Sequence, residues 1–92
     1  MTFEFLVLPA VREVLFQLIW GDRFEEELKS KMTSSGIEFD EIRNRLLKEE
    51  LVYQLKGERG NPYLSLTDKG LAVINRLYEI ERILEGEDVD TE

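Results

Sequence analysis

The sequence contains no cysteine and no histidine. Without cysteine there is no disulfide, no thiolate chemistry and no cysteine-type zinc site. Without histidine the chain lacks the usual general base and the commonest metal ligand. The glycine-rich phosphate loops and the serine nucleophile motif of common enzymes are also missing from the sequence. We therefore expect a protein that is not an enzyme and that has no metal and no cofactor.

Long apolar runs are missing as well. The longest stretch without a polar residue, Phe5 to Val11, is far shorter than the roughly 20 residues that a membrane span needs. No basic leader precedes it, so we expect a cytoplasmic protein that does not bind membranes. A chain of 92 residues forms one domain. Because a domain of this size buries only about 60–65% of its unfolded surface, we also expect a second copy or another partner.

Positive charge is scarce. Lysine and arginine number 12 against 20 aspartates and glutamates, and the net charge of −8 opposes approach to a polyanion. The shortage of positive charge is unevenly distributed along the chain. Residues 29–59 carry a net charge of +1, whereas residues 1–28 carry −4 and residues 60–92 carry −5. This distribution favours a nucleic-acid face within an acidic body. The alternative is that these cations are ordinary solvated helix charges paired with nearby glutamates.

The spacing of apolar residues predicts two helices in the first third of the chain. Pro9 suits a first helical turn, and apolar residues follow at helical spacing until Gly21. Asp22 and Glu25 fit a capping box at the start of a second, short amphipathic helix. Residues 1–8 alternate only loosely, so an extended segment and a helix are both compatible with them.

The middle of the chain predicts a turn, a helix and a β-hairpin. Residues 33–36 have the composition of a turn, and a helix with a narrow apolar face is predicted over about residues 39–49. Residues 51–56 and 63–66 predict two strands, joined by a loop that contains two glycines and a proline.

Thr67 is placed to cap a final helix over residues 67–85. This helix has an apolar stripe too broad for one helix to bury, which predicts dimerisation through Val73, Ile74, Leu77, Ile80 and Leu84. Residues 87–92 form an acidic tail that we expect to be disordered.

This order of elements resembles the winged helix-turn-helix transcriptional regulators of bacteria and archaea, in particular the small dimeric MarR-like and PadR-like types. In that group a glycine and an aliphatic residue precede the recognition helix, as Gly36 and Ile37 do here. A Leu-Thr-acidic/basic-Gly signature follows the wing, matched by residues 66–70. The recognition helix has a buried aliphatic residue, a basic-rich turn and a leucine, matched by Ile42, Arg43, Arg45 and Leu46.

The resemblance implies an α+β, mostly helical winged-helix domain over residues 1–86. It also implies a recognition helix at about residues 39–49 and a two-stranded wing at about residues 52–66. The C-terminal helix, residues 67–85, would pair with its counterpart in a homodimer. The protein would then be a homodimeric DNA-binding transcriptional regulator whose partner is double-stranded DNA.

The basic residues of this segment are candidate phosphate contacts, and Asn44 is a candidate base reader. Arg59 lies between Gly57 and Gly60, a setting typical of a wing tip that enters the minor groove, although a merely polar hairpin loop has the same composition. The predicted DNA-binding residues are Ser34, Ser35, Phe39, Asp40, Arg43, Asn44, Arg45, Lys48, Lys56 and Arg59, with Lys29 and Lys31 as further phosphate contacts.

The start of the predicted recognition helix is acidic, which supports an alternative function. Glu38 stands where the family usually has a serine or threonine cap, and Asp40 and Glu41 occupy positions that normally approach bases. Carboxylates repel phosphates. The alternative is an acidic protein-interaction module, or a DNA mimic, that binds a basic protein partner. Phe39 could contact a base or pack on the preceding helix, and packing is the interpretation we favour.

Overall fold

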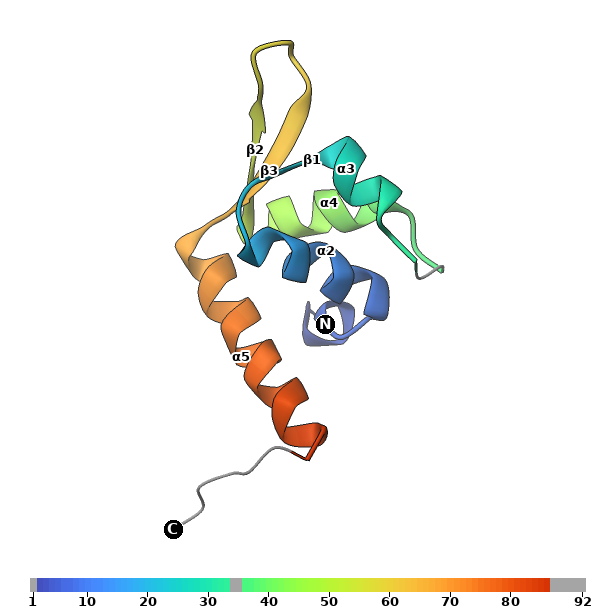
Figure 1. Cartoon of the computed structure of the whole chain (residues 1–92), viewed down its shortest axis with the longest axis vertical. Coiled ribbons are helices and arrows are strands. Elements are labelled where there is room, and N and C mark those ends of the chain that lie inside the picture. The colour runs from blue at the N-terminus through green and yellow to red at the C-terminus, as the bar shows by residue number, and fades with distance from the viewer. Residues whose placement is uncertain (1, 34–35, 87–92) are drawn as a thin grey trace.

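The computed structural model describes residues 2–33 and 36–86. Figure 1 shows a helical body from which a β-hairpin projects at one end, while the last helix runs toward the other end. This is the predicted α+β, mostly helical architecture, with a two-stranded wing and a C-terminal helix. The elements are α1 (Thr2–Leu6), α2 (Pro9–Ile19), β1 (Arg23–Phe24), α3 (Glu25–Ser30), α4 (Phe39–Lys48), β2 (Val52–Lys56), β3 (Pro62–Leu66) and α5 (Asp68–Leu84). The predicted acidic tail, residues 87–92, lies outside the described residues.

The N-terminal segment, whose sequence was compatible with two conformations, contains the short helix α1. Phe5 and Leu6 of α1 are buried. Helix α2 begins at Pro9 as predicted, in the first turn, where the missing N–H leaves no hydrogen bond unmade. Arg12 of α2 forms an ion pair with Glu81 of α5, which ties the first long helix to the last.

The predicted capping box of Asp22 and Glu25 is wrong. The N-cap of α3 is Phe24, and no side chain caps this helix. Residues 23 and 24 instead form β1, which pairs antiparallel with β3 and places Phe24 opposite Tyr63. The rings of these two residues meet edge to face, with centroids 5.8 Å apart. Two residues are too short a strand to produce a recognisable alternating pattern, so the pairing was invisible in the sequence.

The wing hairpin is as predicted, and β1 makes it a three-stranded antiparallel sheet of order β1-β3-β2. In its register Val52 pairs with Leu66, and Lys56 pairs with Pro62 at the far end. The central strand β3 buries Leu64 completely. The base of the wing is therefore part of the core, whereas its tip extends into solvent.

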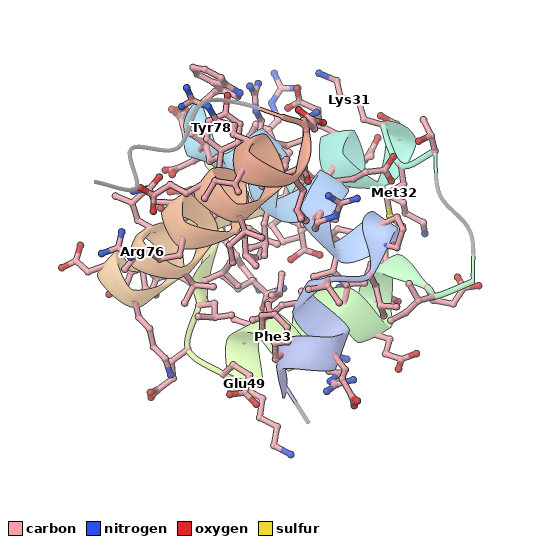
Figure 2. All side chains as sticks on the ribbon, turned by 90° about the horizontal axis from the view of Figure 1, so that it is seen from below. Phe3, Lys31, Met32, Glu49, Arg76 and Tyr78 are labelled. Atoms are coloured by element: carbon pink, nitrogen blue, oxygen red, sulfur yellow. The ribbon has the colours of Figure 1, made fainter. Side chains whose placement is uncertain are left out.

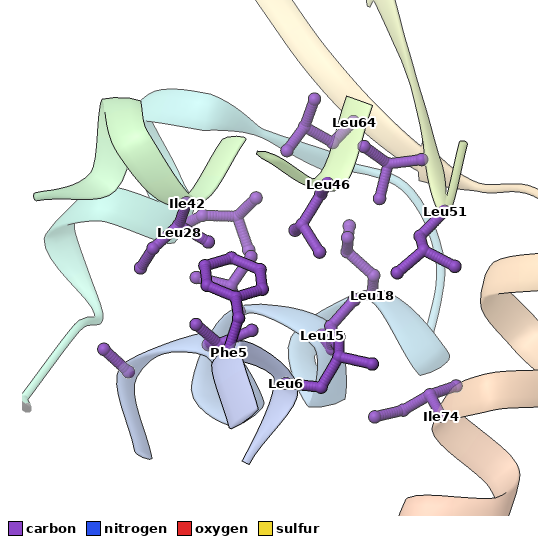
Figure 3. Close-up of a cluster of buried hydrophobic side chains, with 14 of the residues drawn as sticks. Phe5, Leu6, Leu15, Leu18, Leu28, Ile42, Leu46, Leu51, Leu64 and Ile74 are labelled. Carbon is purple, nitrogen blue, oxygen red and sulfur yellow. The ribbon is translucent and has the colours of Figure 1, made fainter. Parts of the chain in front are cut away.

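One apolar core joins the helices α1 to α5 with β2 and β3. Figure 3 shows Leu18 of α2, Leu46 of α4 and Leu64 of β3 meeting in a single cluster with side chains from α1 and α5. Burying each such side chain contributes about 1.5–3 kcal/mol. The buried hydrophobic residues are Phe5, Leu6, Ala10, Val11, Val14, Leu15, Leu18, Leu28, Phe39, Ile42, Leu46, Leu51, Val52, Leu64, Ile74 and Leu77.

Helix α4 ends in a Schellman motif whose left-handed residue is a glutamate. The N–H of Leu51 donates to the carbonyl of Leu46 at 2.9 Å, and the N–H of Glu50 donates to that of Leu47 at 3.0 Å. Glu50 has φ +62°, the left-handed region in which a Cβ costs about 1 kcal/mol. The chain thus turns into β2 without the glycine that usually occupies this position.

The start of α5 is fastened to this same turn. Thr67 caps α5 as predicted, since its hydroxyl accepts from the N–H of Gly70 at 2.8 Å, and the hydroxyl also donates to the carbonyl of Glu50 at 2.7 Å. Lys69 donates to the carbonyl of Glu49 at 2.9 Å. A Cβ on Gly70 would lie 2.0 Å from the carbonyl oxygen of Leu51, so only glycine permits this approach.

We predict that Glu50→Gly raises the free energy of unfolding by about 1 kcal/mol, because glycine adopts the left-handed conformation without the Cβ penalty. Urea unfolding measures the change. Glu49→Gly is the matched control, since Glu49 has an ordinary right-handed φ of −83° and glycine there should destabilise by about 0.5–1 kcal/mol. Equal losses from both substitutions would contradict the argument.

Candidate nucleic-acid interface

Helix α4 is the predicted recognition helix, and it presents a mixed polar face to solvent. Its buried side is made of Phe39, Ile42 and Leu46. Its exposed side carries, at helical spacing, Asp40, Glu41, Asn44 and Lys48. Two carboxylates, one amide and one ammonium group therefore face outward, and the carboxylates lie in the first turn of the helix.

Arg43 lies beside this face but is held by carboxylates of the protein itself. Its Nη1 lies 2.9 Å from Oε1 of Glu25 and 3.3 Å from Oδ1 of Asp40. Its Nε donates to Oδ1 of Asn44 at 3.1 Å. The Arg43 side chain is only 21% exposed. Its positive charge is thus compensated within the molecule.

Glu25 is the buried partner in this network. It lies at the first position of α3 and is 6% exposed. Its second oxygen accepts a hydrogen bond from Nε2 of Gln54, in β2, at 2.5 Å. Burying a carboxylate is unfavourable unless it is paired and hydrogen-bonded, and here both oxygens have donors. One carboxylate therefore links α3, α4 and the wing.

Arg45 points to the other side of α4. Its guanidinium lies over the ring of Phe5, 4.1 Å from the ring centroid. A cation at this distance from an aromatic face is attracted by the ring quadrupole. Arg45 therefore packs against α1, and the structure does not bring it together with the outward face of α4.

The wing carries the exposed cations that the sequence predicted. Lys56 and Arg59 are both exposed, with Glu58 between them along the chain. Gly60 has φ +81°, which makes the tight turn after Arg59 possible. Where the connecting loop of the hairpin begins, a Cβ on Gly57 would lie 3.1 Å from the Phe24 ring. The tip is therefore polar and solvent-exposed, while the start of its loop lies against Phe24 of β1.

Three of the predicted contact residues are in the core. Phe39 is 4% exposed, so it offers no surface to a base and packs as we favoured. Ile74 and Leu77, predicted at the dimer interface, are buried inside the protomer. Ser34 and Ser35 lie outside the described residues. The predictions missed Glu25 and Gln54. Glu25 lies 18 positions from Arg43 and 29 positions from Gln54 along the chain, and no pattern in the sequence indicates that these three residues meet in space.

Helix α5 leaves an apolar groove uncovered beside α1. The groove has a volume of about 390 Å³, and its lining includes Phe3, Val73, Leu77 and Ile80. Ile80 is 46% exposed, and Leu84, one turn further on, is 79% exposed. Figure 2 shows Phe3 and Tyr78 on opposite sides of α5, and Tyr78 packs on Phe16. The open apolar face of α5 is thus the side toward α1.

Among the residues that the structure describes, no helix combines the length and the apolar composition that a bilayer crossing requires. Acidic side chains in residues 2–33 and 36–86 do not gather in groups of three or more that could hold a metal ion.

No protein-family model matches the sequence, and no curated protein matches it. Solved structures do match the fold. AF1382 from Archaeoglobus fulgidus has a TM-score of 0.74 at 20% identity, with 95% of this chain and all of that chain covered. MepR, a transcription regulator of the Staphylococcus aureus multidrug efflux pump MepA, has a TM-score of 0.75 at 14% identity, with 89% of this chain and 63% of MepR covered.

The transcriptional repressor BigR from Xylella fastidiosa has a TM-score of 0.70 at 18% identity, with 94% of this chain and 85% of BigR covered. At such identities the likeness concerns the arrangement of the backbone and not the side chains that bind. The likeness nevertheless covers 89–95% of this chain. The chain therefore has the winged-helix fold of transcription regulators such as MepR and BigR.

Proposed function

We propose that this protein is a homodimeric winged-helix regulator of transcription that binds double-stranded DNA through α4 and the wing. The observation that carries the proposal is the placement of α4, a polar helix lying at the surface beside a wing with an exposed cationic tip. The likeness of the whole fold to proteins described as transcription regulators supports it. The protein would act by occupying an operator and so blocking or recruiting the transcription machinery.

In this proposal the phosphate contacts come from few residues. Lys48, Lys56 and Arg59 are exposed and lie on α4 and the wing. Asn44, on the outward face of α4, is the residue that would read a base edge. Because the rest of the protein is acidic, the affinity would depend on these few cations, and their small number would keep the salt dependence modest, with a slope of about −0.9 for each phosphate contact.

We predict that Arg59→Ala weakens binding to all duplexes by one common factor, because an arginine at the wing tip contributes charge rather than base reading. The slope of log affinity against log salt should become shallower by about 0.9 for each Arg59 that contacts a phosphate, hence by about 1.8 for the dimer. Fluorescence anisotropy with a selected duplex and a scrambled duplex measures both quantities. Glu58→Gln is the control at the neighbouring position and should strengthen binding to both. A loss confined to the selected duplex would contradict this role.

The homodimer of the proposal would form through the open face of α5 beside α1. Val73, Ile80 and Leu84 lie on this face, together with Phe3 of α1. Leaving such side chains in water forgoes about 1.5–3 kcal/mol for each one that could be buried. A two-fold pairing of α5 with its counterpart would cover them and place two copies of α4 for a roughly palindromic site.

We predict that Ile80→Lys converts the dimer to a folded monomer, because Ile80 is half exposed and its loss leaves the protomer core intact. Sedimentation velocity measures the change. Leu71→Lys is the matched control, since Leu71 is 43% exposed against 46% for Ile80 but lies on the opposite side of α5. If Ile80→Lys stays dimeric, or if both variants dissociate alike, another surface forms the dimer.

A second candidate function is favoured by the acidic start of α4. The side chain of Asp40 is 69% exposed, and Glu38 and Glu41 are exposed as well. This acidic face would suit a basic protein partner rather than phosphates.

We predict that the double substitution Asp40→Ser, Glu41→Ser separates the two functions. In a DNA regulator it should raise affinity for a scrambled duplex, because two repulsive charges are removed. In a protein-interaction module DNA binding should stay negligible before and after the change, while a complex recovered from cell extract should weaken. Anisotropy and affinity capture on the same variant measure both, and a variant that alters neither would exclude this face as the functional surface.

A further inference from the structure

Glu25 is the only polar or charged residue that is buried within the described part of the chain. A lone carboxylate in this environment would be costly, so the structure around it must be organised to satisfy it. Arg43 and Gln54 do this from two different elements, at 2.9 and 2.5 Å. The position of the Arg43 guanidinium is thus set by a group in the interior rather than by solvent.

The same guanidinium extends the network to the outward face of α4. A guanidinium is planar and rigid, so fixing its Nη1 against Glu25 also fixes the direction of its Nε–H. That Nε–H donates to Oδ1 of Asn44 at 3.1 Å. Because the side-chain amide of Asn44 is planar too, a hydrogen bond to its oxygen also sets the direction in which its NH2 group points.

We propose that Glu25 and Arg43 are positioning residues that orient Asn44 for base reading, and that Arg43 is not a phosphate contact. The inference rests on the proposed function, since it names how the DNA-binding face discriminates between sequences. An amide held in one orientation favours one pattern of donors and acceptors in the major groove. A freely rotating amide would satisfy several patterns alike.

The ion pair has a second consequence for affinity. A free arginine at position 43 would attract phosphates whatever the sequence, which raises non-specific binding. Pairing with Glu25 and Asp40 compensates that charge inside the protein. Glu25 therefore restrains non-specific affinity at the same time as it supports specificity, and both effects act through Arg43.

The test uses Glu25→Gln, which keeps the size of the side chain and removes its charge, with the exposed neighbour Glu26→Gln as control. A 24-base-pair duplex selected by the wild-type protein from a random pool is compared with a scrambled duplex. Glu25→Gln should bind the scrambled duplex several-fold more tightly, with a salt slope steeper by about 0.9 for each protomer. The ratio of selected to scrambled affinity should fall about tenfold. Glu26→Gln should change both affinities alike and leave this ratio unchanged.

The double variant Glu25→Gln, Arg43→Met tests whether both effects pass through Arg43. It leaves no unpaired buried charge, and thermal unfolding confirms that it is folded at the assay temperature. It should lose the gain on the scrambled duplex while its specificity ratio stays low. A gain that persists without Arg43 would overturn the inference. So would an unchanged ratio in Glu25→Gln, or a single Arg43→Met that weakens both duplexes equally and flattens the salt slope.

The free protein supplies a readout that does not depend on DNA. The Nε–H of Arg43 should give a slowly exchanging NMR signal in wild type and in Glu26→Gln, and this signal should be lost in Glu25→Gln. If no duplex is selected from the pool but the signal behaves as expected, the network is real and the proposed function fails, together with the role assigned to Asn44. If duplexes are selected but the signal is absent from wild type, only the positioning inference fails.

Discussion

The arrangement of α4, the wing and α5 depends on the turn where α4 ends and on the start of α5 that is fastened to it. Helix ends leave carbonyl groups without partners, and here the carbonyls of Glu49, Glu50 and Leu51 accept hydrogen bonds from Lys69 and from the hydroxyl and the N–H of Thr67. Gly70 permits the approach, since any Cβ would collide with Leu51. The short signature at residues 66–70 thus has a physical role at Thr67, Lys69 and Gly70.

This turn also determines where the wing stands. Strand β2 begins directly after Leu51, and β3 ends directly before Thr67, so both legs of the hairpin leave from the same hydrogen-bonded point. The Glu25 carboxylate adds a second attachment, because it binds Gln54 of β2 and Arg43 of α4 together. Helix α4 and the wing are therefore held to each other by two separate polar contacts, one at the foot of the wing and one along its side.

The parts that the sequence predicted are those whose signal is local. The helices followed from apolar spacing, the hairpin from its turn residues, and the Thr67 cap from a hydroxyl beside its own helix. The missed parts depend on contacts distant in sequence. Strand β1 exists only because β3 pairs with it, and Glu25 was assigned to a local capping box whereas its carboxylate is bound by Arg43 and Gln54, from α4 and β2. The sequence also placed Ile74, Leu77, Ile80 and Leu84 in one apolar stripe. In the structure Ile74 and Leu77 are buried in the protomer, whereas Ile80 and Leu84 are exposed.

The net charge of −8 and the proposed partner are compatible if charge acts locally rather than globally. At physiological salt, exposed charges more than about 8 Å apart are largely screened from each other. The acidic residues far from the proposed contact surface would therefore weaken the long-range attraction of the protein to DNA more than they would weaken the contacts of the bound complex. The proposed contact surface combines exposed cations on the wing with the outward face of α4. The charge of Arg43, on α4, is already compensated by its ion pair with Glu25. Such a surface would have little sequence-independent affinity for DNA. Discrimination between sites would then have to come from oriented groups such as Asn44, and a regulator of this kind would gain specificity by having few phosphate contacts rather than many.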